Sequence, residues 1–143
     1  MILLDTNVVS ELYRSTPHAS VVSWFDAQSD DLLYLCAPVL AELRFGVERL
    51  ETGRRKDALR KVIEQLENEL YRDRILPFDV TCAAAYGQLV AGWQRSGRTM
   101  HQMNAFIAAI AAANGAALAT RNVEHFEGLG LILINPFAVS VER

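Results

Sequence analysis

The chain has 143 residues, of which 51% are hydrophobic and 22% are charged, and its formal net charge is −3. A chain of this size and apolar content suits one folded domain, which we expect to span residues 1–143, and argues against a two-domain enzyme or a disordered chain. The negative net charge excludes a broadly basic surface for binding nucleic acid, so any nucleic acid must be contacted by a local group of basic residues.

Targeting and redox signals are few in this sequence. The apolar run Met1–Leu4 is interrupted by Asp5 and has no basic residue beside it, which argues against a signal peptide. No apolar stretch reaches the length of about 18 residues that a membrane span needs. Cys36 and Cys82 lie in apolar runs without metal-ligand spacing, so neither a zinc site nor a disulfide framework is expected. We therefore expect a protein of the reducing cytoplasm that makes no contact with membranes.

Short apolar runs alternate with amphipathic segments along the chain. The apolar runs predict strands at residues 1–4, 32–36, 75–78, 117–120 and 131–134. Helical spacing and capping residues predict helices at residues 8–13, 21–25, 38–47, 52–72, 80–95, 101–113 and 123–126. This alternation predicts an α/β fold in which a parallel sheet of about five strands carries helices on both faces.

Individual residues refine this expectation. Pro77 interrupts the third strand, which indicates a position toward the edge of the sheet. Asp79 is expected to cap the helix after that strand, and Asn114-Gly115 to end the helix before the fourth strand. Trp24, near the first helices, is a candidate contact residue for a partner. Ligands of such sheets bind beyond the carboxyl ends of the strands, so polar residues there are the first candidates for a site.

Two carboxylates occupy such positions. Asp5 directly follows the first strand, where it either binds a ligand or caps the next helix, and the pattern favours neither. Thr6 and Asn7 add further oxygen ligands or hydrogen-bond donors beside it. Glu42 lies one turn into the helix after the second strand and has apolar neighbours. Its carboxylate therefore lies in or beside a buried stripe, and an ordinary position on the helix surface is the alternative.

Two amides complete the candidate set. Asn104 lies near the start of a helix of small residues. Its side chain either faces the carboxyl ends of the strands or accepts hydrogen bonds from the free backbone N–H groups of the first turn. Asn122 follows the fourth strand in Thr120-Arg121-Asn122, where it either joins the site or caps the short helix after it.

Four stretches in register cover nearly the whole chain, namely MILLDTNVVSE (1–11), AELRFG (41–46), NAFIAAIA (104–111) and ATRNVEHF (119–126). Together they resemble the PIN domain family, and more narrowly the VapC and FitB type toxins of bacterial toxin–antitoxin pairs. The resemblance implies an endoribonuclease that uses Mg²⁺, with Mn²⁺ as a substitute, and that inhibits growth by cleaving RNA. It also implies a homodimer and a cognate antitoxin, which is a small DNA-binding protein.

The resemblance assigns roles to the candidate residues. Asp5, Glu42 and Asn104 would hold the metal, and the same three residues with Asn122 form the expected catalytic set. The expected substrate-binding residues are Thr6, Thr120 and Arg121. Phosphodiester cleavage by water needs the phosphate charge neutralised and water activated near neutral pH, and a divalent ion supplies both. Because Mg²⁺ prefers oxygen ligands and keeps several waters, two or three carboxylates suffice.

Asn104 departs from the family pattern, which has Asp at this position. One missing charge weakens the metal site, so we expect this chain as written to be weakly active or inactive. The alternative is a catalytically silent PIN domain that binds an antitoxin or RNA.

Further basic residues are candidates for contacts with the RNA. Arginine suits bidentate contacts with phosphate, and the four candidates are Arg44, Arg95, Arg98 and Arg121. His101 and His125 are candidate acids or bases. The basic cluster within residues 54–61 either adds further contacts with the RNA backbone or forms a solvated helix face. The solvated face is the simpler interpretation.

Overall fold

The computed structural model describes residues 1–138, in which five parallel strands form one sheet. The strands are β1 (Ile2–Leu4), β2 (Leu33–Cys36), β3 (Ile75–Leu76), β4 (Ala117–Ala119) and β5 (Leu133–Ile134). Their order in the sheet is β3-β2-β1-β4-β5, which confirms the predicted α/β fold. Since β1 is the central strand, the residue that follows it is delivered to the middle of the carboxyl edge of the sheet.

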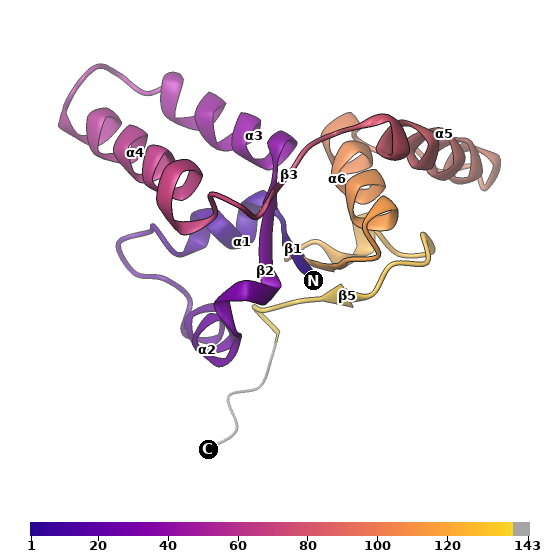
Figure 1. Cartoon of the computed structure of the whole chain (residues 1–143), viewed down its shortest axis with the longest axis horizontal. Helices are drawn as coiled ribbons and strands as arrows, with labels where there is room; N and C mark the ends of the chain where they lie inside the picture. The colour runs from indigo at the N-terminus through magenta and orange to yellow at the C-terminus, as the bar shows by residue number, and fades with distance from the viewer. Residues whose placement is uncertain (139–143) are drawn as a thin grey trace.

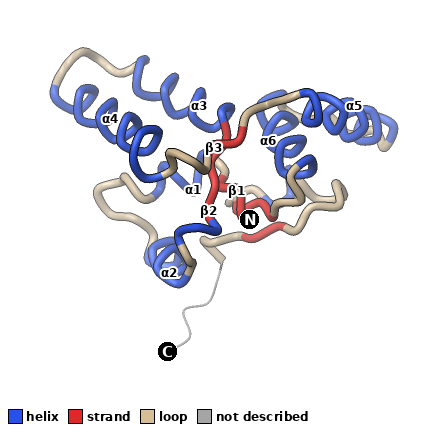
Figure 2. Tube along the Cα trace, in the orientation of Figure 1, coloured by secondary structure: helices blue, strands red, loops and turns tan. Residues whose placement is uncertain are grey.

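Helices connect the strands and form most of the regular structure (Figure 2). The α-helices are α1 (Thr6–Glu11), α2 (Ala19–Ala27), α3 (Ala37–Glu48), α4 (Arg54–Gln65), α5 (Val80–Arg95) and α6 (Gln102–Ala113). Three short helical turns are η1 (Asp30–Leu32), the π-helical η2 (Leu66–Leu70) and η3 (Val123–His125). Within residues 1–138, no helix has the length and apolar content needed to cross a membrane.

The direction in which the chain adds strands reverses after β3. From β1 the chain adds β2 and β3 on one side, and it then crosses to the other side of β1 to add β4 and β5. Right-handed connections therefore place the helices before and after the reversal on opposite faces of the sheet. Figure 1 shows α3 and α4 on one side of the strands and α5 and α6 on the other. The switch point lies between the carboxyl ends of β1 and β4, where doubly wound sheets bind their ligands.

Several local predictions are confirmed. Asp79 caps α5 by accepting a hydrogen bond from the backbone N–H of Cys82 at 3.0 Å. Gly115, which follows the cap residue Asn114 of α6, adopts a φ of +62°, a conformation that favours glycine. The strand before Pro77 lies at the edge of the sheet.

Other boundaries differ from the prediction. The helix expected over residues 52–72 is shorter, because α4 begins only after Gly53 and passes into the π-helical turn at Leu66. The strand expected at residues 131–134 is limited to its last two residues, and the short helix expected at residues 123–126 is a single 3₁₀ turn. These differences lie at the ends of elements and leave the order of strands and helices unchanged.

The central strands are buried on both faces. Leu3 and Leu4 of β1 and Leu118 and Ala119 of β4 are all 0% exposed, as expected for parallel strands between two helix layers. The buried face of α6 consists mainly of alanines, which allow its neighbours to approach closely.

The prediction that Trp24 is a contact residue is wrong. Its side chain is 8% exposed and packs edge to face against Phe25, with ring centroids 5.4 Å apart. Val21 on the same helix is also buried, so the apolar stripe of α2 faces the core rather than a partner.

Glu11 is a buried carboxylate that fixes the connection between α1 and α2. It is 6% exposed, and its two oxygens accept hydrogen bonds from the backbone N–H of His18 at 3.0 Å and from the guanidinium of Arg14 at 3.3 Å. Burial alone raises the pKa of a carboxyl, but these hydrogen bonds and the positive charge of Arg14 lower the pKa of Glu11 below its ordinary value.

We expect Glu11→Gln to lower the Tm by a few degrees at pH 7. A carboxylate with a depressed pKa stabilises the fold above its unfolded pKa, and this contribution is lost as the pH falls through the folded pKa. The Tm difference between wild type and variant should therefore disappear below the ordinary carboxyl range. Thermal melts followed by circular dichroism across that range measure it, and a difference that is constant with pH contradicts the assignment.

Candidate active site

The carboxylate of Asp5 lies at the switch point and is 5% exposed. Its Oδ1 accepts a hydrogen bond from the backbone N–H of Thr6 at 2.8 Å, which places Asp5 at the cap position of α1. Its Oδ2 accepts hydrogen bonds from the hydroxyl of Thr120 at 2.8 Å and from the amide of Asn7 at 3.4 Å. Asp5 therefore caps a helix and lies at the expected site position at the same time.

Thr120 holds Asp5 from the neighbouring strand. The register pairs Leu4 with Ala119, and the backbone N–H of Asp5 donates to the carbonyl of Ala119 at 2.9 Å, so the next residues on the two strands meet. Thr120 is 0% exposed, and its hydroxyl also accepts a hydrogen bond from the backbone N–H of Asn122 at 3.1 Å. The buried hydroxyl of Thr120 therefore positions Asp5, and a contact of Thr120 with substrate stays a prediction.

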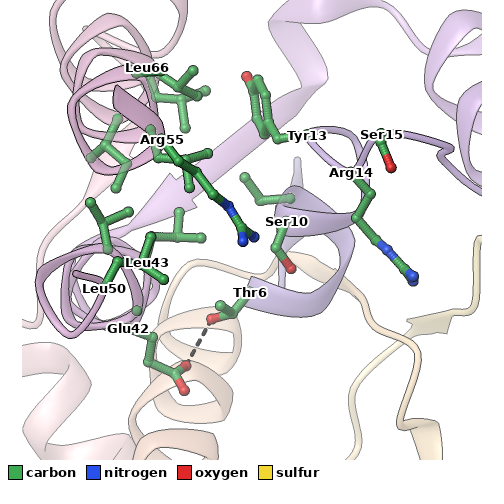
Figure 3. A pocket seen from close by; sticks show the side chains of 17 residues that line it. Thr6, Ser10, Tyr13, Arg14, Ser15, Glu42, Leu43, Leu50, Arg55 and Leu66 are labelled. Carbon is green, nitrogen blue, oxygen red and sulfur yellow. Dashed lines mark hydrogen bonds between the residues drawn. The ribbon is translucent and has the colours of Figure 1, made fainter. Parts of the chain in front are cut away.

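Glu42 is linked to Asp5 through Thr6. The hydroxyl of Thr6 donates to Oε1 of Glu42 at 2.8 Å, as Figure 3 shows. The same residue gives its backbone N–H to Asp5, so Thr6 serves both carboxylates. Glu42 is partly exposed on α3, whereas Asp5 is buried. The structure thus brings the two predicted acids into one hydrogen-bonded unit.

The electrostatics of this unit favour a cation. Burial raises the pKa of the Asp5 carboxyl above its ordinary value. The hydrogen bonds from Thr120 and Thr6 oppose this increase, the negative charge of Glu42 adds to it, and the charge of His125 opposes it. A positive ion between the carboxylates would remove the repulsion that Glu42 imposes on Asp5.

Cys36 ends β2 near these acids, but its thiol is a poor metal ligand. Burial, with smaller contributions from the charges of Asp5 and Glu42, raises the pKa of the Cys36 thiol to about 12. The thiol therefore stays protonated, whereas only the thiolate binds metals well. The oxygen donors that remain suit Mg²⁺ or Mn²⁺ better than zinc.

An apolar groove of about 830 Å³ opens beside Thr6 and Glu42. It lies between α1, α3 and α4, and Figure 3 shows the Arg55 side chain reaching into it from α4. Its apolar lining includes Leu43, Val47, Leu59, Val62 and Leu66. A contiguous apolar surface of this kind marks a site for another molecule.

Arg121 and Asn122 follow β4 and contact the site through their backbone. The N–H of Arg121 donates to the side-chain oxygen of Asn7 at 3.1 Å. Its guanidinium is exposed and lies over the ring of Phe137, 4.6 Å from the ring centroid. Asn122 occupies the cap position of η3, but its side chain makes no capping hydrogen bond. The roles of these two side chains stay predictions.

The sequence patterns did not predict that Asn7 links two segments of the site. They indicated only a further oxygen ligand or hydrogen-bond donor beside Asp5. Its amide group donates to Asp5, and its oxygen accepts the hydrogen bond from Arg121. One side chain therefore ties the start of α1 to the end of β4. The available signal was the run of three polar residues directly after a buried strand.

The arginines predicted to guide RNA are not equivalent. Arg44 forms a two-point salt bridge with Glu67, with N–O distances of 2.7 and 2.6 Å. The guanidinium of Arg98 instead lies 3.8 Å from the ring centroid of Trp93. Arg44 is thus occupied by a carboxylate, whereas Arg98 and Arg121 stack on rings and present their edges to other groups.

The sequence profile of the PIN domain matches residues 2–129. The chain belongs to the PIN domain family. It is 46% identical over 137 residues to plasmid stability protein StbB of Pseudomonas syringae pv. tomato, covering 96% of this chain and 99% of StbB. It is 40% identical to VapC ribonuclease Y4jK of Sinorhizobium fredii, with coverage of 96% and 98%. It is 39% identical to toxin FitB of Neisseria gonorrhoeae, with coverage of 96% and 99%.

This PIN domain also resembles a solved structure along its whole length. The structure of FitAB bound to an IR36 DNA fragment superposes with a TM-score of 0.92 at 36% identity, covering 100% of both chains. The similarity confirms the PIN-type fold that the four sequence motifs predicted.

Asn104 of this PIN domain lies in a second hollow, of about 300 Å³, which His125 also lines. Within residues 1–138, no hydrogen bond joins Asn104 to either carboxylate of the pair. Its link to them is indirect: it shares the hollow with His125 of η3, and Asn122 directly before η3 bonds to Thr120, which holds Asp5. Direct coordination of a shared ion by Asn104 stays a prediction.

The oxygen donors of this PIN domain fit a divalent ion. Mg²⁺ is commonly held by one or two carboxylates together with waters, and Asp5 and Glu42 supply two. In the described part of the chain, no group of three or more His, Cys, Asp or Glu side chains is arranged to hold a metal. The third family position is filled by the amide of Asn104, an oxygen ligand without charge. The residues present therefore suit a weakly held ion.

Proposed function

We propose that this chain, as a single PIN domain over residues 1–143, is the toxin of a bacterial toxin–antitoxin pair and a metal-dependent endoribonuclease. The observation that carries the proposal is the pair of carboxylates, Asp5 and Glu42, tied through Thr6 at the switch point of the sheet. Relatives named VapC ribonuclease and toxin FitB, at 40% and 39% identity, support the same activity. An RNA substrate places its action in the cytoplasm.

We propose that Asp5, Glu42 and Asn104 hold Mg²⁺, or Mn²⁺ in its place. When bound, the ion neutralises charge on the phosphate and makes water more acidic. The chain's own contribution is orientation: Thr120 and Thr6 fix the buried Asp5 carboxylate, so that it needs no rearrangement to receive a cation. Glu42 is partly exposed, so we propose that its carboxylate lies on the side of the site that is open to substrate.

Contacts with the RNA are proposed for Thr6, Thr120 and Arg121, and Asn122 is proposed as a member of the catalytic set. Stacking on Phe137 leaves the N–H groups at the edge of the Arg121 guanidinium able to donate to a phosphate. Thr6 bonds to both carboxylates, through its backbone N–H to Asp5 and through its hydroxyl to Glu42. Asn122 presents a polar side chain at the end of β4, where ligands of this sheet bind.

We propose that the apolar groove between α1, α3 and α4 receives the antitoxin. The groove ends at Thr6 and Glu42, so a segment that fills it reaches the catalytic pair. A basic residue on that segment would pair with Glu42 and take the place of the metal ion. Binding in the groove would therefore block the nuclease without any change of fold. As the family resemblance implies, we also propose that the chain forms a homodimer.

Filling the groove should weaken antitoxin binding. Ala58 is an exposed residue of α4 that lines the groove, so Ala58→Trp places a large ring where the partner lies without disturbing the core. We expect its affinity for the antitoxin, measured by calorimetry, to fall at least about tenfold, or about 1.4 kcal/mol. Ala91→Trp, at an exposed position of α5 outside the groove, is the matched control. Equal affinities of the two variants would place the antitoxin elsewhere.

A catalytically silent binding module is the second candidate, and Asn104 is the observation that favours it. Both candidates predict binding of an antitoxin or RNA, but only the ribonuclease predicts cleavage of RNA. RNA cleavage assays with and without Mg²⁺, on this chain and on Asn104→Asp, test the proposal. Metal-dependent cleavage by either form supports the ribonuclease, and no cleavage by both favours the binding module.

A further inference from the structure

The hollow that contains Asn104 is called the α6 pocket below, and its residues come from three segments. It measures about 300 Å³, and its lining includes Trp93, Arg98, His101, Asn104, Glu124 and His125. These residues belong to the end of α5, the turn and first residues of α6, and η3. The pocket is linked to the catalytic pair, because η3 in its wall follows Asn122, whose N–H donates to the Thr120 hydroxyl that holds Asp5.

Hydrogen-bond donors dominate the α6 pocket. Arg98, His101 and His125 line it, and its one carboxylate, on Glu124, has a side chain that is 64% exposed and lies 3.9 Å from the imidazole of His125. The start of α6 adds backbone N–H groups, because His101 at the cap position makes no side-chain capping hydrogen bond and the first turn carries no acid. A guanidinium and free backbone N–H groups gathered at one helix start favour an anionic ligand.

Two features of the pocket wall point to a ligand with oxygen acceptors. Arg98 is held in place, because its guanidinium stacks on Trp93 at 3.8 Å and donates to the carbonyl of Glu127 at 3.3 Å. A guanidinium fixed in this way loses little further freedom when it binds. Trp93 is 6% exposed, and among residues 1–138 its indole N–H has no hydrogen-bond partner. An unpaired buried donor of this kind is unusual and calls for an acceptor.

We propose that the α6 pocket binds a backbone phosphate of the RNA strand, adjacent to the phosphate that is cleaved. The proposal rests on the proposed ribonuclease function. Asp5 and Glu42 repel a phosphodiester, and the chain has a net charge of −3, so RNA must be attracted by local cationic groups near the acids. The α6 pocket supplies the guanidinium of Arg98 together with the N–H groups at the start of α6. Arg98 and His101 are then positioning residues for the substrate.

Binding of a labelled single-stranded RNA oligonucleotide tests this assignment. Fluorescence anisotropy in EDTA, over a series of salt concentrations, gives the affinity without cleavage. His101→Ala and Arg98→Ala are each expected to weaken binding at least about fivefold, and Arg98→Ala to reduce the log–log salt slope by about one. Gln102→Ala, an exposed neighbour outside the pocket lining, should leave both unchanged. His101 makes no capping hydrogen bond, so its variant tests the pocket even if Arg98→Ala unfolds.

The outcomes separate this inference from the proposed function. If His101→Ala and a folded Arg98→Ala bind RNA as tightly as Gln102→Ala, or if the wild type binds no RNA, the pocket assignment is overturned whatever the nuclease assay gives. If the variants weaken binding of the antitoxin but not of RNA, the pocket serves a protein carboxylate instead. If RNA binding weakens as expected but no form cleaves RNA, the pocket assignment stands and the ribonuclease proposal fails.

Discussion

Asn104→Asp is expected to raise Mg²⁺-dependent RNA cleavage by two or more orders of magnitude, or about 2.7 kcal/mol of barrier. The amide of Asn104 can coordinate a cation, but it lacks the negative charge that draws Mg²⁺ from water. A third carboxylate that holds the ion together with Asp5 and Glu42 would raise the affinity for the ion and make its bound water easier to activate. Initial rates of cleavage of a broad transcript pool, with and without Mg²⁺, measure the change.

Gln65→Glu is the matched control for this gain. It adds the same charge to an exposed position of α4 that lines neither the groove nor the hollow around Asn104. Its cleavage rate should equal that of the wild type. Expression of Asn104→Asp should also arrest growth unless the antitoxin is co-expressed. If Asn104→Asp binds Mn²⁺ well and still cleaves no RNA, the ribonuclease proposal is contradicted and the silent binding module is favoured.

Position along the chain was enough to predict the main members of the site. A parallel sheet gathers the residues after its strands at one edge, so Asp5 after β1 and Thr120 after β4 were predictable neighbours. The apolar surroundings of Glu42 likewise indicated a half-buried carboxylate. These inferences succeed because the order of the elements along the chain decides which ends meet.

The direction of individual side chains could not be predicted in the same way. Thr120 turns inward to Asp5 and Asn7 bridges two segments because of the register between β1 and β4, which no single stretch of sequence encodes. Trp24 faces the core because α2 packs there, although its pattern also suits an exposed contact. Asn104 lies in a pocket formed by three segments, and this could not be derived from its helix alone.

The second large effect is expected at Asp5. In the Asn104→Asp background, Asp5→Asn should abolish the gain in cleavage, a loss of at least about a hundredfold, or about 2.7 kcal/mol of barrier. It should also weaken Mn²⁺ binding at least about tenfold, or about 1.4 kcal/mol. Asn is nearly isosteric with Asp, and its oxygen can still accept the hydrogen bond from the backbone N–H of Thr6. The expected losses therefore report the missing charge at the switch point.

Asp79→Asn is a matched control for Asp5→Asn, because Asp79 also caps a helix through its carboxylate but lies on α5, away from the pair. Both substitutions remove one charge from a capping residue, but Asp5 is buried and Asp79 is exposed, so the Tm of each variant is measured separately. Only Asp5→Asn should change Mn²⁺ affinity in calorimetry and cleavage in the transcript assay. Unchanged metal affinity in Asp5→Asn would remove Asp5 from the metal site and leave it as a capping residue held by Thr120.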